Sequence, residues 1–379
     1  MSNTKNTPIS TSDRERVFYY DLARTIAIIS VSCNHAVSRS FEVHQNPLTE
    51  YSKISVGLSF VKSILWIFSR IGVPLFLMIS GSLLLDRNYE DKSVLKRFIK
   101  HNWKGLLLTT EIWLFIMFWY MQLMDNSILK SEGFGHAAIG CIETMLFINQ
   151  TTMPSMWYMS MILFLYLTIP IIAIAVKKID KRYLLALSIA VTVCAMVVPN
   201  INEFLQACGV NHTFDLAFEY ENIFSYYLVY VLAGFWISKG ALVRFKTFGL
   251  AFGFAAFFVG TSLFQLFLMS SNSNYFVRYA DIGIVLSSVC LYELLRRKAS
   301  AVISLKKPVT FISVSAFGIY FLHICVMTAL NKVMDKFIST QYLSRFLILE
   351  IVSFLVSVLV IFITSKVGII KKYLYMMKT

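Results

Sequence analysis

The sequence predicts an all-α polytopic membrane protein with about ten transmembrane helices and with both termini in the cytoplasm. Of its 379 residues, 57% are hydrophobic and only 15% are charged, whereas a soluble domain carries about 25% charged residues. Two further observations support this fold class. Apolar windows of membrane-spanning length recur along the chain, and Lys and Arg gather in every second connection between them.

Ten apolar windows are long enough to cross a bilayer as helices, which takes about 17–25 residues each. They cover residues 18–38, 62–85, 105–124, 157–176, 183–199, 223–238, 247–269, 279–295, 310–331 and 344–365. The polar stretches between them are too short to bury a core of their own. We therefore expect one integral membrane domain over residues 1–379, with residues 1–17 as a polar cytoplasmic segment and no extra soluble domain.

The basic residues alternate between the two sides of the predicted membrane. Of the 35 Lys and Arg, 25 fall in the N-terminal segment, in every second connection and in the C-terminal tail, and eight fall in the other connections. Cytoplasmic loops of membrane proteins carry such an excess of positive charge, so this pattern predicts cytoplasmic termini. The net charge of +14 is then a topology signal, because the basic residues are spread over short segments beside the membrane. We expect the lipid bilayer as a partner and no nucleic acid.

The first predicted span contains three ionisable side chains, Asp21, Arg24 and His35. Such groups are costly inside a bilayer and persist mainly where they face a polar cavity or a partner. Arg24 and His35 are eleven residues apart, which on a helix corresponds to about 16 Å along the axis and roughly 20° around it. They therefore lie on one helix face near opposite leaflets, a spacing that suits a protein handling one molecule on each side of the membrane.

Each of these three residues also has a purely structural interpretation. Asp21 lies three residues before Arg24, so the two can form an ion pair that merely makes the helix insertable. The functional alternative is a guanidinium that receives a phosphate from the cytoplasm. His35 is either a general base, as neutral imidazole often is near pH 7, or a helix-end histidine bonded to a nearby carbonyl. Asn34 beside it is a packing or hydrogen-bond partner and a candidate to line the same cavity.

Further cationic and titratable residues fall near or inside other spans. The run Lys96, Arg97 and Lys100 precedes the third span, where it forms either a second phosphate-binding patch or a positive-inside anchor. Arg70 lies inside the second span, next to a Gly and a Pro that loosen the helix, and we expect it to line a cavity. His323 lies midway along the ninth span, where a packing role and a functional role are equally compatible with the sequence.

Signatures of several soluble enzyme classes are absent from the sequence. It contains no G-x-S-x-G, no Walker A loop, no H-E-x-x-H and no G-x-G-x-x-G. We therefore expect no metal site, no nucleotide hydrolysis and no dinucleotide cofactor.

Four stretches of the sequence resemble the acyltransferase-3 superfamily, the bacterial integral-membrane O-acyltransferases. Their order and spacing cover nearly the whole chain. The first matches the basic-x10-His motif of that family's first helix. The stretches are Tyr20-Asp21-Leu22-Ala23-Arg24 followed by His35, then Gly72 to Gly81, then Met156-Trp157-Tyr158 through Leu165-Tyr166-Leu167 to Pro170, and finally Phe317 to His323.

The resemblance implies transfer of an acyl group, usually acetyl, from cytoplasmic acetyl-CoA to a sugar hydroxyl on the outer face. Acetyl-CoA would be a donor substrate, with no cofactor bound permanently. His35 would be the catalytic histidine, and Arg24 its motif partner. The family's Arg-x-x-Arg corresponds here to Arg97-Phe98-Ile99-Lys100, with Lys in the last position. Asp21 and Lys96 extend the expected donor site.

The same resemblance suggests where the acceptor binds and where the protein lies. Trp157 and Tyr320, which fall in the third and fourth stretches, join Arg70, Asn34 and His323 as candidates to line the cavity. The chain resembles the stand-alone branch that O-acetylates surface polysaccharides. This branch implies polysaccharide biosynthesis in the bacterial cytoplasmic (inner) membrane, with an envelope glycan or a polyprenyl-linked oligosaccharide as acceptor.

Two alternatives to an enzyme remain open at this stage. A transporter or flippase of a lipid-linked glycan explains buried charges equally well, although it does not predict the four matching stretches. A non-catalytic scaffold predicts that changes at Asp21, Arg24, His35 and Arg70 are tolerated apart from losses in folding.

Overall fold

The computed structural model describes residues 17–41, 54–125, 127–148, 156–210, 214, 226–271, 273, 275–337 and 342–377, and all regular structure among them is helical. The helices are α1 (Phe18–Ser40), α3 (Val56–Arg70), α4 (Gly72–Leu84), α5 (Lys92–Phe98), α6 (Lys104–Asp125), α7 (Ser127–Ser131), α8 (Gly133–Met145), α9 (Trp157–Lys178), α10 (Lys181–Thr192), α11 (Val198–Ala207), α13 (Tyr227–Ser238), α14 (Thr247–Ser270), α15 (Ile282–Lys298), α16 (Lys306–Phe337), α17 (Tyr342–Thr364) and α18 (Gly368–Tyr373). The predicted all-α polytopic fold is confirmed.

Every predicted span coincides with a helix, although the count of ten remains a prediction. Among the described residues, seven helical segments are long and apolar enough to cross a membrane, and one of them, Ile282–Lys336, joins α15 to α16. Helix α1 lies outside this group, because its charged and polar side chains lower its hydropathy. Helix α13 has only 12 residues, about 18 Å of helix, which is less than the thickness of a hydrocarbon core.

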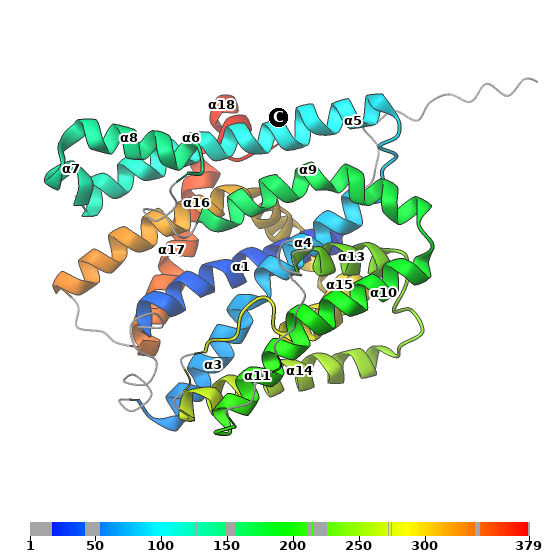
Figure 1. Cartoon of the computed structure of the whole chain (residues 1–379). Helices are drawn as coiled ribbons and strands as arrows, with labels where there is room; N and C mark the ends of the chain where they lie inside the picture. The colour runs from blue at the N-terminus through cyan, green and yellow to red at the C-terminus, as the bar shows by residue number, and fades with distance from the viewer. Residues whose placement is uncertain are drawn as a thin grey trace, which may run out of the picture.

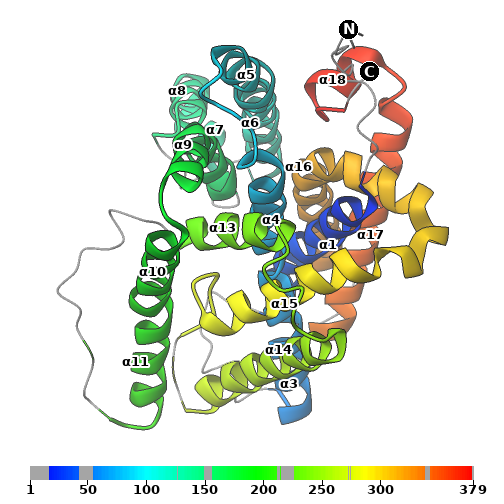
Figure 2. The ribbon, with the colours of Figure 1, turned by 90° about the vertical axis from the view of Figure 1, so that its right-hand side faces the viewer.

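Helix α1 occupies the centre of the bundle. It packs against α16, α3, α4, α17 and α15, and Figure 2 shows it, in blue, with α16 and α17 on one side and α4 and α15 on the other. Helices α5 to α8 and the pair α10 and α11 lie at the periphery (Figure 1). A polar helix enclosed by apolar ones keeps its ionisable residues out of lipid, as intramembrane charges require.

The second predicted span is broken at Ile71, between α3 and α4. The backbone carbonyl of Phe68, next to the break, accepts a hydrogen bond from Ser30 Oγ of α1 at 2.7 Å. Gly72 permits α4 to approach α1 closely, since a Cβ there would lie 2.6 Å from the carbonyl oxygen of Ala27. The sequence Gly72-Val73-Pro74 favours such a break, and it leaves Arg70 at the end of α3.

Two glycines allow α4 and α13 to pack backbone against backbone. A Cβ at Gly81 would lie 1.9 Å from the carbonyl oxygen of Val231, and a Cβ at Gly234 would lie 2.0 Å from that of Met78. Small residues at such crossings are how helices associate in membranes, where apolar side chains gain little by leaving lipid. The short helix α13 is thereby held in the bundle.

Several connections rich in Lys and Arg meet at one end of the bundle. Lys177 Nζ donates to the backbone carbonyl of Asp86 at 2.9 Å, and Lys239 Nζ lies 2.7 Å from a carboxylate oxygen of the same Asp86. Arg297 Nη2 donates to the backbone carbonyl of Leu242 at 2.6 Å. Four connections with the predicted cytoplasmic charge excess thus lie together, and we refer to this as the basic end.

Candidate functional site

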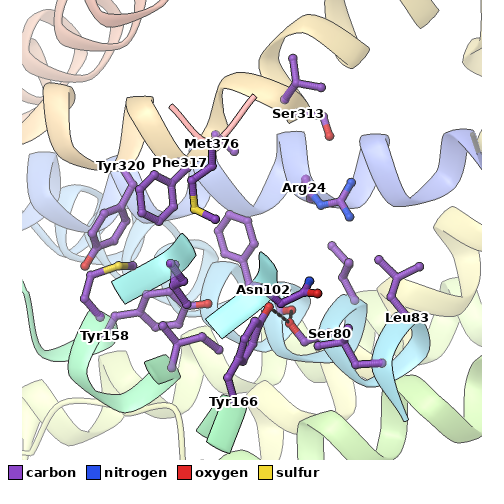
Figure 3. Close-up of a pocket in the computed structure, with 18 of the residues that line it drawn as sticks. Arg24, Ser80, Leu83, Asn102, Tyr158, Tyr166, Ser313, Phe317, Tyr320 and Met376 are labelled. Atoms are coloured by element: carbon purple, nitrogen blue, oxygen red, sulfur yellow. Dashed lines mark hydrogen bonds between the residues drawn. The ribbon is translucent and has the colours of Figure 1, made fainter. Parts of the chain in front are cut away.

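A cavity of about 340 Å³ opens near the basic end, between α1, α4, α6, α9 and α16, and we call it the first cavity. Its volume lies within the range of small-molecule sites, about 300–1,000 Å³. Figure 3 shows Arg24 and Asn102 in its wall, with Tyr158 and Tyr320 at its other extremity. It is lined by Arg24, Phe76, Ile79, Ser80, Leu83, Leu84, Arg87, Asn102, Leu106, Tyr158, Met159, Ile162, Tyr166, Ser313, Val314, Ala316, Phe317, Tyr320, Tyr375 and Met376.

Asp21 fixes the position of Arg24 at the wall of this cavity. Its carboxylate is 1% exposed and lies 3.4 Å from Arg24 Nη1. It also accepts hydrogen bonds from Ser313 Oγ at 2.7 Å and Thr310 Oγ1 at 3.2 Å, both on α16. Asp21 therefore connects α1 to α16 and does not line the cavity itself. Arg24 is 28% exposed and presents its cation to the cavity.

Sequence reasoning missed the second arginine of the first cavity, Arg87. Its Nη1 donates to Asn102 Oδ1 at 3.4 Å, and both residues line the cavity. Arg87 belongs to the loop after α4, where the basic residues indicated only topology. Its role in the wall depends on the position of Asn102, fifteen residues further along the chain.

The basic run before α6 divides between two environments. Lys96 and Arg97, on α5, are exposed and line neither the first cavity nor its neighbour. After α5 the chain forms a turn of π-helix at Ile99–Trp103, an irregularity frequent at functional sites. Lys100, in this turn, lines a second cavity of about 800 Å³ between α6 and the C-terminal segment.

A series of ring contacts runs from the far extremity of the first cavity to His35. The rings of Tyr158 and Tyr320 are 5.9 Å apart, those of Tyr320 and His323 are 6.3 Å apart, and those of His323 and His35 are 5.3 Å apart. His35 itself does not line the first cavity. In this structure the rings of Tyr320 and His323 lie between the Arg24 cavity and His35.

The tautomer of His323 follows from its hydrogen bond. The ring is fully buried, and Nδ1 lies 2.7 Å from the backbone carbonyl oxygen of Ile319. Because a carbonyl only accepts, Nδ1 carries the proton, and Nε2 of the neutral ring is an acceptor. Among the described residues Nε2 has no hydrogen-bond partner. An unfilled acceptor therefore lies close to His35.

Arg70 and Trp157 belong to one aromatic cluster. The guanidinium carbon of Arg70 lies 3.7 Å from the ring centre of Trp66 and 5.0 Å from that of Tyr279, and Trp157 lies 5.4 Å from Tyr279. Stacking on aromatic faces stabilises a partly buried cation. Among the described side chains no group bonds the buried Nε of Arg70.

Two polar residues of α1 that are close to His35 in sequence, Ser32 and Asn34, bond to side chains of other helices. Asn34 Oδ1 accepts from Ser69 Oγ at 3.4 Å, and Ser32 Oγ donates to Glu350 of α17 at 2.8 Å. Glu350 was not among the sequence candidates. The signal was present, since Glu350 is the one acidic residue of the window 344–365, and an intramembrane carboxylate indicates a functional site.

The loop that carries Tyr279 is held by a second acidic residue that sequence reasoning missed. Asp281 is 1% exposed and accepts hydrogen bonds from Tyr275 Oη at 2.9 Å and from the backbone N–H of Arg278 at 2.6 Å. Asn200 Nδ2 of α11 donates to the same carboxylate.

Comparison with known proteins gives one match. The family model described as an acyltransferase domain (Acyl_transf_3) matches residues 17–364. No curated protein and no solved structure matches the chain. The matched region begins one residue before α1 and ends with α17, so both cavities and the ring series lie largely within it.

Proposed function

Since the chain belongs to the acyltransferase-3 family and is an acyltransferase, we propose that it transfers acetyl from cytoplasmic acetyl-CoA to a sugar hydroxyl of a cell-envelope polysaccharide or its lipid-linked precursor. The proposed location is the bacterial inner membrane. The observation that supports this proposal best is the first cavity, which carries Arg24 at the basic end and extends toward the rings that lead to His35.

The first cavity suits the donor's extended thioester arm. Two cations, Arg24 and Arg87, line it, and its remaining lining is mostly apolar or aromatic. Guanidinium groups bind phosphate oxygens in pairs, whereas an apolar channel accommodates a chain that carries little charge. Arg24 and His35 lie about 16 Å apart along α1, a distance that an extended arm spans. Acetyl-CoA would act as a substrate, with no permanently bound cofactor.

In the proposed reaction His35 acts as a general base. Its imidazole takes the proton of the sugar hydroxyl while the hydroxyl oxygen attacks the thioester carbonyl carbon. The new C–O bond forms, the C–S bond breaks, and the thiolate of coenzyme A receives the proton from the imidazolium. General-base assistance of this kind contributes about 10²–10⁴-fold. The unfilled acceptor at His323 Nε2 is available to an N–H or O–H at the reacting centre.

The geometry adds one requirement to this reaction. Because ring contacts of Tyr320 and His323 link the first cavity to His35, the thioester would have to pass these rings to reach His35. Loss of one aromatic pair costs about 0.5–1.5 kcal/mol.

The test is transfer of label by the purified protein. Acetyl-CoA labelled in the acetyl group is incubated with the full chain in lipid nanodiscs and with polyprenyl-linked oligosaccharides from the host envelope. We expect alkali-labile label on sugar hydroxyls. A flippase would leave the sugars unlabelled while moving them across vesicles, and this result, obtained with every envelope glycan of the host, would overturn the proposal.

A further inference from the structure

The second cavity has a composition that points to an anionic ligand. Its volume is about 800 Å³, and no carboxylate occurs among the described residues that line it. Cations enter it from two parts of the chain that are far apart in sequence. It is lined by Lys100, His101, Asn102, Lys104, Gly105, Leu108, Thr109, Lys372, Tyr373, Met376 and Met377.

One wall of the second cavity is a face of α6 and of the π-helical turn before it. Lys100, Lys104 and Leu108 follow one another at four-residue intervals, the spacing that aligns side chains along a helix. His101 and Gly105 form the adjacent row. Of the run that the sequence presents as a charged anchor, Lys100 thus lines the second cavity together with Lys104, whereas Lys96 and Arg97 do not.

The opposite wall is the C-terminal segment, residues 372–377. Trp113 Nε1 of α6 donates to the backbone carbonyl of Leu374 at 2.7 Å, and the hydroxyl groups of Tyr375 and Thr364 lie 2.7 Å apart. Met376 has a φ of 52°, in the left-handed region that a residue with a side chain rarely adopts. The segment is thus held by a hydrogen bond to α6 at Leu374 and by one to α17 at Tyr375.

The two cavities adjoin each other. Asn102 and Met376 line both, and Arg87 donates to Asn102 from the side of the first cavity. A ligand that fills both would have a charged part beside Lys100, Lys104 and Lys372 and a less charged arm beside Tyr158. This distribution of charge matches a ligand in which a nucleotide with phosphate groups is joined to a thioester arm of little charge.

A purely structural interpretation is that these lysines are positive-inside anchors whose ammonium groups reach toward lipid headgroups. That interpretation explains their abundance at the basic end. It does not explain why Lys104 and Lys372, which lie on separate helices, both line the second cavity. No carboxylate occurs among the described residues that line this cavity. Cations gathered without counter-charge raise the local concentration of anions.

We propose that the second cavity binds the phosphate groups of the acyl donor's nucleotide, with Lys100, Lys104 and Lys372 as the binding cations. This inference rests on the proposed function and deepens it. It assigns the C-terminal segment to the donor site and divides the basic run, with Lys100 in contact with the donor and Lys96 and Arg97 outside. The thioester arm then passes Asn102 and Met376 into the first cavity.

The experiment compares two ligands and three variants. The full chain in nanodiscs of neutral phosphatidylcholine is titrated with coenzyme A and with pantetheine, which lacks the nucleotide and its phosphates. K104Q and K372Q each remove one cation from the second cavity. K366Q is the matched control, because Lys366 is exposed, lies in the same tail, and lines neither cavity.

We expect K104Q and K372Q to weaken coenzyme A binding about tenfold each, as the loss of one charged hydrogen bond predicts. Pantetheine affinity should stay unchanged, and K366Q should match the wild type with both ligands. Equal coenzyme A affinity in all three variants would overturn the inference while wild-type binding still supports the proposed function. Wild-type protein that binds neither ligand would overturn both.

An anionic lipid headgroup offers the same phosphate chemistry, so a second arm distinguishes the two sources. The titrations are repeated with phosphatidylglycerol in the nanodiscs, and bound lipid is measured by native mass spectrometry. We expect K104Q and K372Q to keep their loss of coenzyme A affinity in either lipid. Loss of phosphatidylglycerol retention with unchanged coenzyme A affinity would show that a headgroup occupies the cavity and would overturn the inference.

Discussion

The two ends of α1 place their ionisable residues in different surroundings. Arg24, at the basic end, borders a cavity that contains a second arginine and adjoins another cavity lined by three lysines. His35 is half-buried, and its ring contacts that of His323, from which ring contacts lead through Tyr320 to Tyr158. One end concentrates positive charge around cavities, and the other places an imidazole beside another ring.

This difference indicates how one helix can serve two ligands. Phosphates need several cations and room for ions, and the basic end supplies both. A general base needs a defined position within hydrogen-bond reach of the reacting hydroxyl, and the contact with His323 helps to position His35. We therefore expect changes at the basic end to affect donor affinity and changes near His35 to affect the rate of transfer.

The largest effect is expected at His35. His35→Ala should lower the rate of acetyl transfer about 10²–10⁴-fold, because the general base is lost, and should leave acetyl-CoA affinity unchanged. Turnover and titration with purified protein measure the two quantities. His136→Ala is the matched control, since His136 is exposed on α8. Transfer by the His35 variant at the control's rate would remove this histidine from the mechanism.

The complementary change at the other end is Arg24→Ala. We expect acetyl-CoA affinity to fall about 10–100-fold, the cost of removing one charged hydrogen-bonding group, with a smaller change in the rate at saturation. Arg244→Ala serves as control, because Arg244 is an exposed residue of the basic end that lines neither cavity. Unchanged acetyl-CoA affinity in the Arg24 variant would show that the ion pair of Arg24 with Asp21 serves only to make α1 insertable in the membrane.

A smaller effect is expected at His323, which lies beside His35 without reaching the first cavity. His323→Phe keeps the ring packing and removes the buried acceptor Nε2. The rate of transfer should fall about tenfold, in line with one hydrogen bond, and donor affinity should not change. A loss of donor affinity without a loss of rate would assign His323 to the donor site. It would contradict the division of roles between the two ends of α1.

The smallest effect concerns stability at the loop that holds Tyr279. Asp281 is 1% exposed and accepts hydrogen bonds from Tyr275 Oη and from the backbone N–H of Arg278. Asp281→Ala leaves these donors without their acceptor, so it should lower the unfolding temperature by a few degrees. Thermal unfolding of the variant beside the wild type measures this. An unchanged unfolding temperature would show that this carboxylate does not hold the loop.

The sequence predicted the parts of the fold that depend on local composition. Apolar windows and charge alternation identified the helices, and Gly72 with Pro74 indicated the break in the second span. Arg24, Arg70 and His35 were singled out as candidates because an ionisable residue in an apolar run is a signal in itself. Each of these inferences needed only neighbouring residues.

The parts that the sequence did not predict depend on contacts between distant segments. Lys372 looked like one more basic residue of the tail, and only the docking of that tail on α6, through Trp113, makes it part of a cavity. Arg87 gained its role through Asn102 in the same way. Hydrophobic periodicity does not specify which helices are neighbours. Lys372 and Arg87 could therefore not be distinguished from basic residues that only anchor the protein at the cytoplasmic face.

The most direct test of the central claim is the sidedness of transfer. The protein is reconstituted in sealed vesicles of one orientation, with labelled acetyl-CoA supplied only at the basic end and a lipid-linked glycan acceptor accessible only at the opposite face. We expect label to appear on the acceptor across the bilayer, and we expect Arg24→Ala and His35→Ala each to abolish or slow its appearance. Label that appears only when donor and acceptor share one face would show that the acetyl group does not cross the membrane.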